Sequence, residues 1–489
     1  MSTGHGKPVI ALAARQDADA PAQSRPSGRR WLSLAVLLTG NFVTILDLFI
    51  VNVALASIER GLGASLAEIQ LIMVGYSTGY GVLLMNGARL GDLFGRRRVF
   101  LFGMAVFTAA SLLCGVAGAP VFLIAARIMQ GIGAALLMPQ VYASIRVLFE
   151  GDQRRRAFSV MGAVQGMAGI VSQLIGGYLI EHSFGGLGWR LVFLVNIPVG
   201  LAVLAFGRWT IEETRAPVAT KLDLWGAFVG ALGLSLLLFP PMEGREYNWP
   251  WWSIAGPALS FVVLYYFVRY EESLSKRGGV PIIEVSLLRN RDFVRGLCAA
   301  FLFFTTISSY SLSLTMFLQV GLGMSPLLAG EVFTPSAIGF FVGSLAAARL
   351  ATAIGQRALL LGMVVFLLGL GLSIATGLSA PQNLAALITA LVLNGLGQGI
   401  VIPLALNVIL SSVSEAQAGI GSGVLSTMQI IGSASGVTIV GVIFFSLLGQ
   451  GQPSIQAAVY GYAFGVATLY NLAALFMSLV LFSMLRRGA

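Results

Sequence analysis

The stretch Gly87–Arg98 reads GARLGDLFGRRR and is a short charged turn between two long apolar runs. Three successive arginines, Arg96–Arg98, end the first run and place the turn in the cytoplasm, because Lys and Arg are enriched in cytoplasmic loops. The glycines allow a sharp turn and a close approach of two helix ends, and Asp92 can cap the next helix or pair with an arginine. The turn therefore indicates two membrane-spanning helices joined on the cytoplasmic side.

A weaker copy of this turn occurs at Ala347–Arg357, which reads AARLATAIGQR. Four residues recur at one constant spacing between the copies, whereas Asp92 is replaced by Thr352. A second pattern, the tetrad Gln130–Gly133, returns as Asn394–Gly397 at a spacing a few residues larger. The chain is therefore predicted to consist of two related halves.

The composition excludes a water-soluble protein. Apolar residues make up 57% of the 489 residues, charged residues make up 10%, and the mean hydropathy is +0.86. Soluble domains carry about 25% charged residues, so lipid must cover most of this chain. The net charge of +10 does not indicate nucleic-acid binding, because the basic residues lie between apolar runs and do not gather on one face.

Apolar runs of about 20 residues alternate with short polar turns from Trp31 onward, which is typical of membrane-spanning helices. When the N-terminus is placed inside, 26 of the 30 Lys and Arg residues fall in cytoplasmic segments. Both termini are therefore predicted to be cytoplasmic. Fourteen spans are predicted, at 33–57, 66–86, 99–118, 120–145, 157–180, 191–209, 223–241, 252–270, 295–319, 328–350, 358–377, 385–410, 419–447 and 457–484.

These spans divide an all-α membrane protein into two six-helix bundles and two inserted helices. Residues 1–30 are polar and lack periodicity, so they are predicted to form a disordered cytoplasmic tail. The apolar run that follows is too long for a cleavable signal peptide. Residues 31–209 are assigned to the N-terminal bundle, 210–290 to a linker with the two extra helices, and 291–489 to the C-terminal bundle. Repeated bundles with a site at their interface are a transporter arrangement.

Four motifs resemble those of the major facilitator superfamily, in particular its fourteen-helix drug:proton antiporter branch. Gly87–Arg98 resembles the superfamily's loop motif between spans two and three, and Arg127–Gly133 resembles its span-four motif. Leu46–Leu55 and Trp189–Pro198 resemble the branch's span-one and span-six motifs. The resemblance implies a major facilitator fold and proton-coupled export of amphipathic drugs, antibiotics or secondary metabolites across the inner (plasma) membrane by alternating access.

Span five departs from the antiporter pattern. The motif ends in a Gly-Pro pair before two glycines, whereas this chain has Ser172-Gln173 before Gly176-Gly177. A facilitator or proton symporter for a specific metabolite is therefore an alternative. A non-transporting membrane sensor is a further alternative, but it would need a soluble signalling domain. The chain has no Gly-x-x-x-x-Gly-Lys-Ser/Thr motif, so we do not expect ATP to drive transport directly.

The sequence has too few histidines for a His-based metal site or a catalytic triad. It has two histidines, His5 and His182, and two cysteines, Cys114 and Cys298. The cysteines are predicted near opposite ends of different spans, too far apart for a disulfide. We therefore expect no enzyme activity, metal or cofactor. The expected partners are the lipid bilayer, protons and a small amphipathic substrate, and a cationic substrate is one of the options. The sequence does not show whether a periplasmic adaptor binds.

Asp47 is an acid placed inside the hydrocarbon, 17 residues after Arg30 and 12 before Glu59. A charged Asp there costs at least about 2.5–3.5 kcal/mol on insertion scales. It must therefore be neutral, paired or in contact with a wet central cavity. Burial disfavours the charged form of a carboxyl group and a nearby cation favours it, so a partner that moves would make Asp47 a proton switch.

Arg127 in span four is the predicted partner, because its depth along the helix lies within about 6 Å of that of Asp47. We expect protonation of Asp47 to free it from Arg127 or from backbone contacts and to bias the outward/inward equilibrium. The alternative is a static pair that fixes helix packing. Glu331 opens span ten and is interpreted either as an interface residue or as a second acid that faces the cavity and takes part in proton coupling.

Other polar residues of the spans are candidates for the substrate cavity, because polar groups that face lipid are costly. Helix–helix hydrogen bonding is the alternative role. The cavity candidates are Asn52, Gln130, Gln165, Tyr310, Gln398 and Gln429.

The charged turn is interpreted, from its position and the family resemblance, as a cytoplasmic latch that holds the two bundles together in one state. The alternative is that it only sets the topology. The residues assigned to the latch are Gly87, Arg89, Asp92, Gly95, Arg96 and Arg97.

Overall fold

The computed structural model describes residues 27–215, 223–244, 247–277, 279, 281, 287, 289–413, 418–448 and 456–485. Within these residues the regular structure is helical and contains no strand. Nearly all of the predicted tail, residues 1–30, lies outside the described residues. Both cysteines are free, Cys114 buried and Cys298 exposed, as the predicted topology requires.

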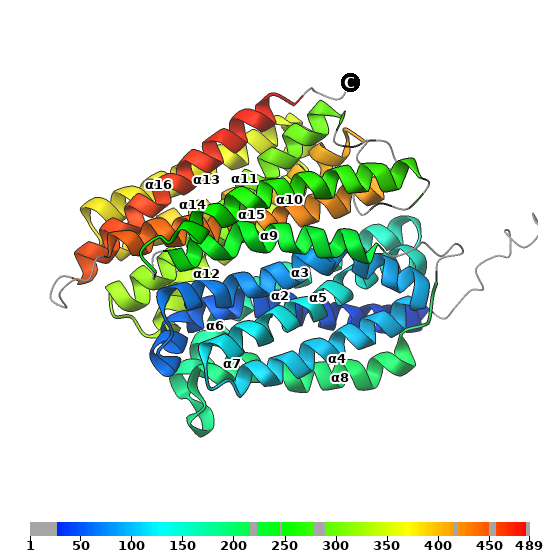
Figure 1. Cartoon of the computed structure of the whole chain (residues 1–489), viewed down its shortest axis with the longest axis horizontal. Coiled ribbons are helices and arrows are strands. Elements are labelled where there is room, and N and C mark those ends of the chain that lie inside the picture. The colour runs from blue at the N-terminus through cyan, green and yellow to red at the C-terminus, as the bar shows by residue number, and fades with distance from the viewer. Residues whose placement is uncertain are drawn as a thin grey trace, which may run out of the picture.

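The N-terminal half is a bundle of long helices that lie side by side (Figure 1). Its helices are α2 (Ser27–Leu62), α3 (Leu66–Phe94), α4 (Arg96–Gly115), α5 (Pro120–Leu148), α6 (Gly151–His182), the short α7 (Leu191–Leu194) and α8 (Asn196–Thr210).

The C-terminal half repeats this arrangement after two inserted helices, α9 (Leu224–Gly244) and α10 (Trp251–Lys276). Its helices are α11 (Arg291–Met316), which continues into a π-helical turn at Phe317–Gly321, α12 (Pro326–Ile354), α13 (Arg357–Ser379), α14 (Leu384–Leu410), α15 (Ala418–Leu447) and α16 (Gln456–Ser483).

The number of spans agrees with the sequence. Thirteen helices within the described residues are long and apolar enough to cross a membrane, and α3, with 29 residues, is the remaining predicted span. Several helices extend beyond the predicted apolar runs; α6, for example, begins at Gly151 instead of residue 157. Charged residues at the ends of a span can continue its helix into water, because the apolar run marks only the part that lipid covers.

The two halves share one packing scheme. Helix α5 packs against α3 and α4, and α14 packs in the same way against α12 and α13. The repeat-related glycines Gly131 and Gly395 make this possible: a Cβ atom would lie 2.1 Å from the Tyr76 carbonyl oxygen at the first and 1.9 Å from that of Ser336 at the second. Any side chain would push the helices apart, so glycine at these two places allows a close approach of the helices in each bundle.

The inserted helices lie over the seam between the halves (Figure 1). Helix α9 contacts α3 of the first half and α15 of the second, and α10 packs against α9. Three hydrogen bonds join the halves in the part of the molecule opposite the charged turn: Asn52 Nδ2 to Ser311 Oγ at 3.0 Å, Gln319 Nε2 to the Val53 carbonyl at 2.8 Å, and Ser325 Oγ to Glu181 Oε2 at 2.8 Å. The halves are therefore joined directly at the predicted outer side.

Candidate functional site

Asp47 and Arg127 form an ion pair inside the N-terminal half. Arg127 Nη1 lies 2.5 Å from Asp47 Oδ2, and the two side chains are 1% and 0% exposed. Asp47 comes from the middle of α2 and Arg127 from the first half of α5, so the structure brings together the two residues that the sequence paired by depth. A pair this deeply buried is tolerated only when its remaining hydrogen-bonding groups are also satisfied.

Two amides complete the surroundings of the Asp47 carboxylate. Its Oδ1 atom accepts from Gln130 Nε2 at 2.8 Å and from Asn196 Nδ2 at 2.7 Å. Together with Arg127, the carboxylate thus receives three donors, from α5 and α8. An ionised carboxylate only accepts hydrogen bonds, so this geometry suits the charged form of Asp47.

Gln130 is locked within this cluster. Its Nε2 also donates to Ser111 Oγ at 2.8 Å, and its Oε1 accepts from Arg127 Nη1 at 2.5 Å and from Cys114 Sγ at 3.8 Å. The sequence placed Gln130 in the substrate cavity. The structure places it among hydrogen-bonding side chains inside one bundle, because α4 and α5 pack closely enough for Ser111 and Cys114 to reach it.

The guanidinium of Arg127 has further partners in α3 and α7. Its Nε donates to the Ile72 carbonyl at 3.3 Å, and its Cζ lies 4.5 Å from the ring centre of Tyr76 and 5.7 Å from that of Phe193. Aromatic faces attract a cation, most strongly where water is excluded. Arg127 therefore connects α2, α3, α5 and α7 through a single side chain.

A small cavity lies between the halves, beside this cluster. It measures about 20 Å³ and is lined by Arg127, Asn52 and Ser77 from the first half and by Ser308 and Ser433 from the second, together with apolar side chains. A cavity of this size holds about one water molecule, whereas sites for drug-sized ligands measure about 300–1,000 Å³. This cavity is therefore too small to be the wet chamber predicted from the sequence, and Arg127, not Asp47, is among its lining residues.

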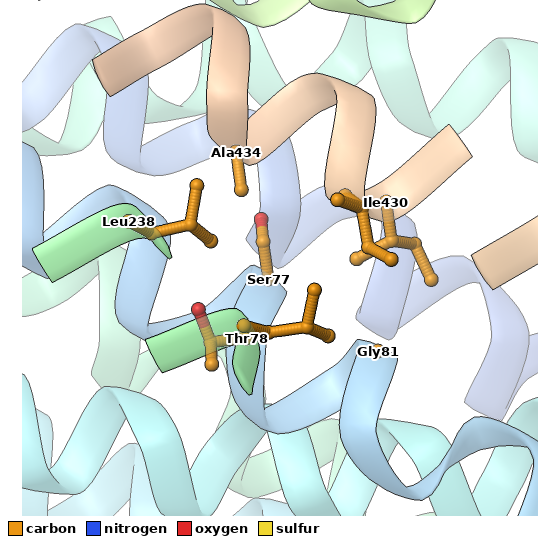
Figure 2. Close-up of a pocket in the computed structure, with 8 residues that line it drawn as sticks. Ser77, Thr78, Gly81, Leu238, Ile430 and Ala434 are labelled. Carbon is orange, nitrogen blue, oxygen red and sulfur yellow. The ribbon is translucent and has the colours of Figure 1, made fainter. Parts of the chain in front are cut away.

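A second crevice of about 10 Å³ lies where α9 covers the seam. Figure 2 shows Ser77 and Thr78 of α3 opposite Leu238 of α9 and Ala434 of α15. Ile430 of α15 and Gly81 of α3 lie further along the same seam (Figure 2). A Cβ atom on Gly81 would lie 3.0 Å from Ile430 Cγ2, so α3 and α15 are already in close contact here. The seam is filled by side chains from both halves and from the inserted α9.

The remaining candidates for the substrate cavity lie in different surroundings. Asn52 lines the cavity, whereas Tyr310 is 5% exposed within the second half, with its hydroxyl 2.8 Å from Ser373 Oγ. Three further candidates have half-buried side chains that line neither of the two cavities: Gln165, Gln398 and Gln429. These three stay predictions for an arrangement in which the chamber is open.

Glu331 lies apart from the ion pair. Its side chain, near the start of α12, is exposed and does not line either cavity. The structure therefore favours the interpretation of Glu331 as an interface residue, because an acid within one turn or so of a helix end can reach the membrane surface.

The charged turn is fixed by contacts within itself and with the segment that follows α8. Gly95 has φ = 104°, a value that favours glycine, and Arg96 Nη2 lies 2.9 Å from Asp92 Oδ1. The Arg97 backbone N–H donates to Glu213 Oε1 at 3.1 Å, and that of Arg96 donates to the Thr214 carbonyl at 3.0 Å. The segment that follows α8 thus folds back on the turn. The sequence did not indicate this contact.

Arg89 connects the turn to a later part of the linker. Its Nη2 donates to the carbonyl of Pro281, and its charge interacts with Glu271 of α10 and with Asp223 at the start of α9. The sequence assigned the latch to contacts between the bundles. The structure instead directs Arg89 to the inserted segment between them, because α9 and α10 lie over the end of α3.

Asn196 and Ser111 are functional candidates that the sequence analysis missed. Asn196 was part of the span-six motif, but no role followed from it, because its distance from Asp47 depends on how α8 packs against α2. Ser111 carried no signal, since isolated serines are common in apolar helices, where the hydroxyl bonds to the preceding turn.

Comparison with known proteins places this geometry among transporters. The family model described as Major Facilitator Superfamily matches residues 37–437. The chain is 40% identical over 428 residues to the probable actinorhodin transporter of Streptomyces coelicolor, covering 87% of this chain and 74% of that protein. It is 34% identical over 429 residues to the puromycin resistance protein pur8 of Streptomyces alboniger, covering 86% and 82%.

A solved structure supports the fold. A bacterial homolog of the human lysosomal transporter Spinster, in an inward-facing and unoccupied conformation, matches with a TM-score of 0.66. The match covers 95% of this chain and 100% of that chain at 16% sequence identity. At this identity the likeness concerns the arrangement of the helices.

Proposed function

Because the chain belongs to the major facilitator superfamily, we propose that it exports an amphipathic organic compound, such as an antibiotic or other secondary metabolite, across the plasma membrane. Its similarity to an actinorhodin transporter and a puromycin resistance protein supports this substrate class. The two bundles, taken as residues 31–209 and 291–489, rock about the closed cavity to expose it to alternate sides. Both termini lie in the cytoplasm in this proposal.

Proton coupling is the proposed energy source, and one observation carries it: a fully buried carboxylate is bound to an arginine that itself borders the space between the halves. Protonation neutralises Asp47 and weakens its hold on Arg127. The uncompensated charge of Arg127 then faces the cavity and repels a cationic substrate. Each proton that crosses the membrane into the cytoplasm releases about 2.3 kcal/mol of free energy per 100 mV of membrane potential.

The charge change must alter the balance between the two open states to drive transport. A ligand shifts a conformational equilibrium only by its difference in affinity for the two states. Arg127 holds α2, α3, α5 and α7 in their present positions, so its release loosens the half that faces the cavity. The three hydrogen bonds between the halves at the predicted outer side break when the chamber opens outward.

The latch acts through the inserted helices in this proposal. Arg89 of the turn binds the Pro281 carbonyl and interacts with Glu271 and Asp223. When the first half rocks, α3 must carry Arg89 away from these partners. The turn therefore stabilises one state through the linker.

The Asp47→Asn variant tests the proposal, because it keeps the shape of the side chain and removes the titratable group. In energised vesicles, with cationic and neutral dyes compared, we expect proton-driven export to be lost. The matched control is Asp292→Asn, which removes an acid at the start of α11 that pairs with Arg295 at 3.1 Å. Export with an unchanged pH dependence in Asp47→Asn would overturn the proposal.

A proton symporter or facilitator is the second candidate, and α6 favours it. This helix runs without interruption from Gly151 to His182, and Ser172, in place of a glycine, bonds back to the Gly169 carbonyl at 2.8 Å. Proteoliposomes separate the candidates. Substrate added outside acidifies the lumen if protons enter with it and makes the lumen alkaline if protons leave in exchange.

A further inference from the structure

One acceptor in the cluster around Asp47 is unused. Asn196 is 1% exposed, and its Oδ1 atom has no hydrogen-bond partner among the described residues, although its Nδ2 donates to Asp47 Oδ1 at 2.7 Å. Gln130 differs, because both ends of its amide are engaged. A buried acceptor is normally paired, so the open oxygen of Asn196 calls for an explanation.

Protonation of Asp47 changes which partners it needs. The ionised carboxylate needs only donors, whereas the neutral acid carries one O–H group that must find an acceptor. Arg127 offers no acceptor. The Oε1 atom of Gln130 already accepts from Arg127 Nη1 and Cys114 Sγ. Among the side chains that contact Asp47, the oxygen of Asn196 is the acceptor still available.

We propose that Asn196 is a two-way positioning residue for Asp47: its amide donates to the carboxylate and, after turning over, accepts the O–H of the neutral acid. The nitrogen and oxygen of an amide are similar in size, so the turn needs little extra space. The proton then resides on Oδ1, on the side of α8, while Oδ2 remains toward Arg127. This inference rests on the proposed role of Asp47 as the proton-binding group.

The second half supplies an internal comparison. Asn471 lies in α16, the counterpart of α8, and is 0% exposed. Its Oδ1 accepts from Ser309 Oγ at 2.8 Å, and neither residue of this pair is an acid. Where no acid is present, the amide oxygen is thus used by a hydroxyl group. Where the acid is present, the oxygen is left open.

The other titratable groups near Asp47 do not compete for its proton. Arg127 of α5 is a donor only. Tyr76 of α3 donates its hydroxyl to the Thr44 carbonyl at 3.1 Å. Cys114 of α4 is buried with its Sγ 3.8 Å from Gln130 Oε1. The proton of neutral Asp47 is therefore directed toward Asn196.

The Asn196→Leu variant removes both roles of the amide, because leucine has a similar volume and no polar atom. The ionised carboxylate loses the donor of Asn196 and keeps Arg127 and Gln130, while the neutral acid loses its acceptor. These two losses shift the protonation equilibrium of Asp47 in opposite directions, so the pH midpoint of export does not isolate the acceptor role. A readout of the O–H group of the neutral acid isolates it.

Infrared difference spectra of the purified full chain, recorded between low and high pH, give a direct readout. The carboxyl C=O band that Asp47→Asn removes should move to higher frequency in Asn196→Leu, because its O–H no longer donates. Asn196→Ser, which retains a hydroxyl able to donate and accept, should keep the band near its original place. A control in the second half, Asn471→Leu, should leave the band unmoved.

The outcomes distinguish the inference from the function on which it rests. If Asp47→Asn removes no band and leaves the pH dependence of export unchanged, the proposed proton coupling fails. If Asp47→Asn removes the band but Asn196→Leu does not move it, proton coupling stands and the role of Asn196 is overturned. A shift of equal size in Asn471→Leu would also overturn it, since that residue is far from Asp47 in the other half.

Discussion

The two halves of this transporter place polar clusters on matching helices, but only one cluster is charged. In the first half, α2, α4, α5 and α8 bring Asp47, Arg127, Gln130 and Asn196 together. In the second half, α11, α13 and α16 supply Tyr310 with Ser373, and Ser309 with Asn471. The backbone contacts are the same in both halves, as Gly131 and Gly395 show. The duplicated scaffold thus carries titratable chemistry on one side and a neutral hydrogen-bonded core on the other.

This difference assigns distinct roles to the halves. A neutral cluster keeps its hydrogen bonds at any physiological pH. The charged cluster changes its bonding when one proton binds. We therefore expect substitutions in the first cluster to change the pH dependence of transport and those in the second to change only stability.

The largest effect is expected for Arg127→Ala. This change leaves the Asp47 carboxylate buried without its cation, and breaking a buried pair costs about 3–5 kcal/mol. The melting temperature in detergent should fall sharply, and export should be lost. If Arg127→Ala melted at the wild-type temperature, the pair could not be a structural centre of the first half.

Arg127→Lys should impair export less than Arg127→Ala. Lysine keeps the charge but not the planar group that bonds Asp47, Gln130 and the Ile72 carbonyl together. Initial rates of dye export, normalised to the amount of protein in the membrane, measure this. Equal loss in both variants would mean that geometry, and not charge alone, decides the function of Arg127.

A moderate effect on stability alone is expected for Tyr310→Phe. The change removes the hydroxyl that lies 2.8 Å from Ser373 Oγ and should cost about 1 kcal/mol, the usual contribution of one neutral hydrogen bond. Melting should shift by a small amount while the pH profile of export stays in place. A displaced pH profile would show that the second cluster also takes part in coupling.

The smallest effect is expected for Glu331→Gln. The side chain is exposed near the start of α12, so loss of its charge removes no buried partner. The number of protons exchanged per substrate, measured from the transport equilibrium at set pH gradients, should equal that of the wild type. A lower number would reinstate Glu331 as a second coupling acid.

The sequence predicts the fold well because its signals are local. Apolar runs, the charged turn and its weaker copy depend on neighbours along the chain, and they lead to fourteen spans in two related halves. The depth of Asp47 and Arg127 follows from helical rise alone, so their proximity could also be predicted. Each of these inferences needs only position along a helix.

The sequence does not fix which way a helix is turned about its axis. Gln130 points into the N-terminal cluster and not toward the cavity, because α4 and α5 pack closely and Ser111 reaches it. Asn196 reaches Asp47 only because α8 packs against α2. The width of the chamber depends in turn on how the two bundles lie, and the inserted α9 covers the seam (Figure 1).

The lumenal pH of proteoliposomes that contain an entrapped pH dye tests the central claim most directly. When substrate is added outside, the wild-type chain should make the lumen more alkaline as protons leave in exchange, and Asp47→Asn should leave it unchanged. Substrate-dependent proton movement of the same size in both proteins would contradict the account.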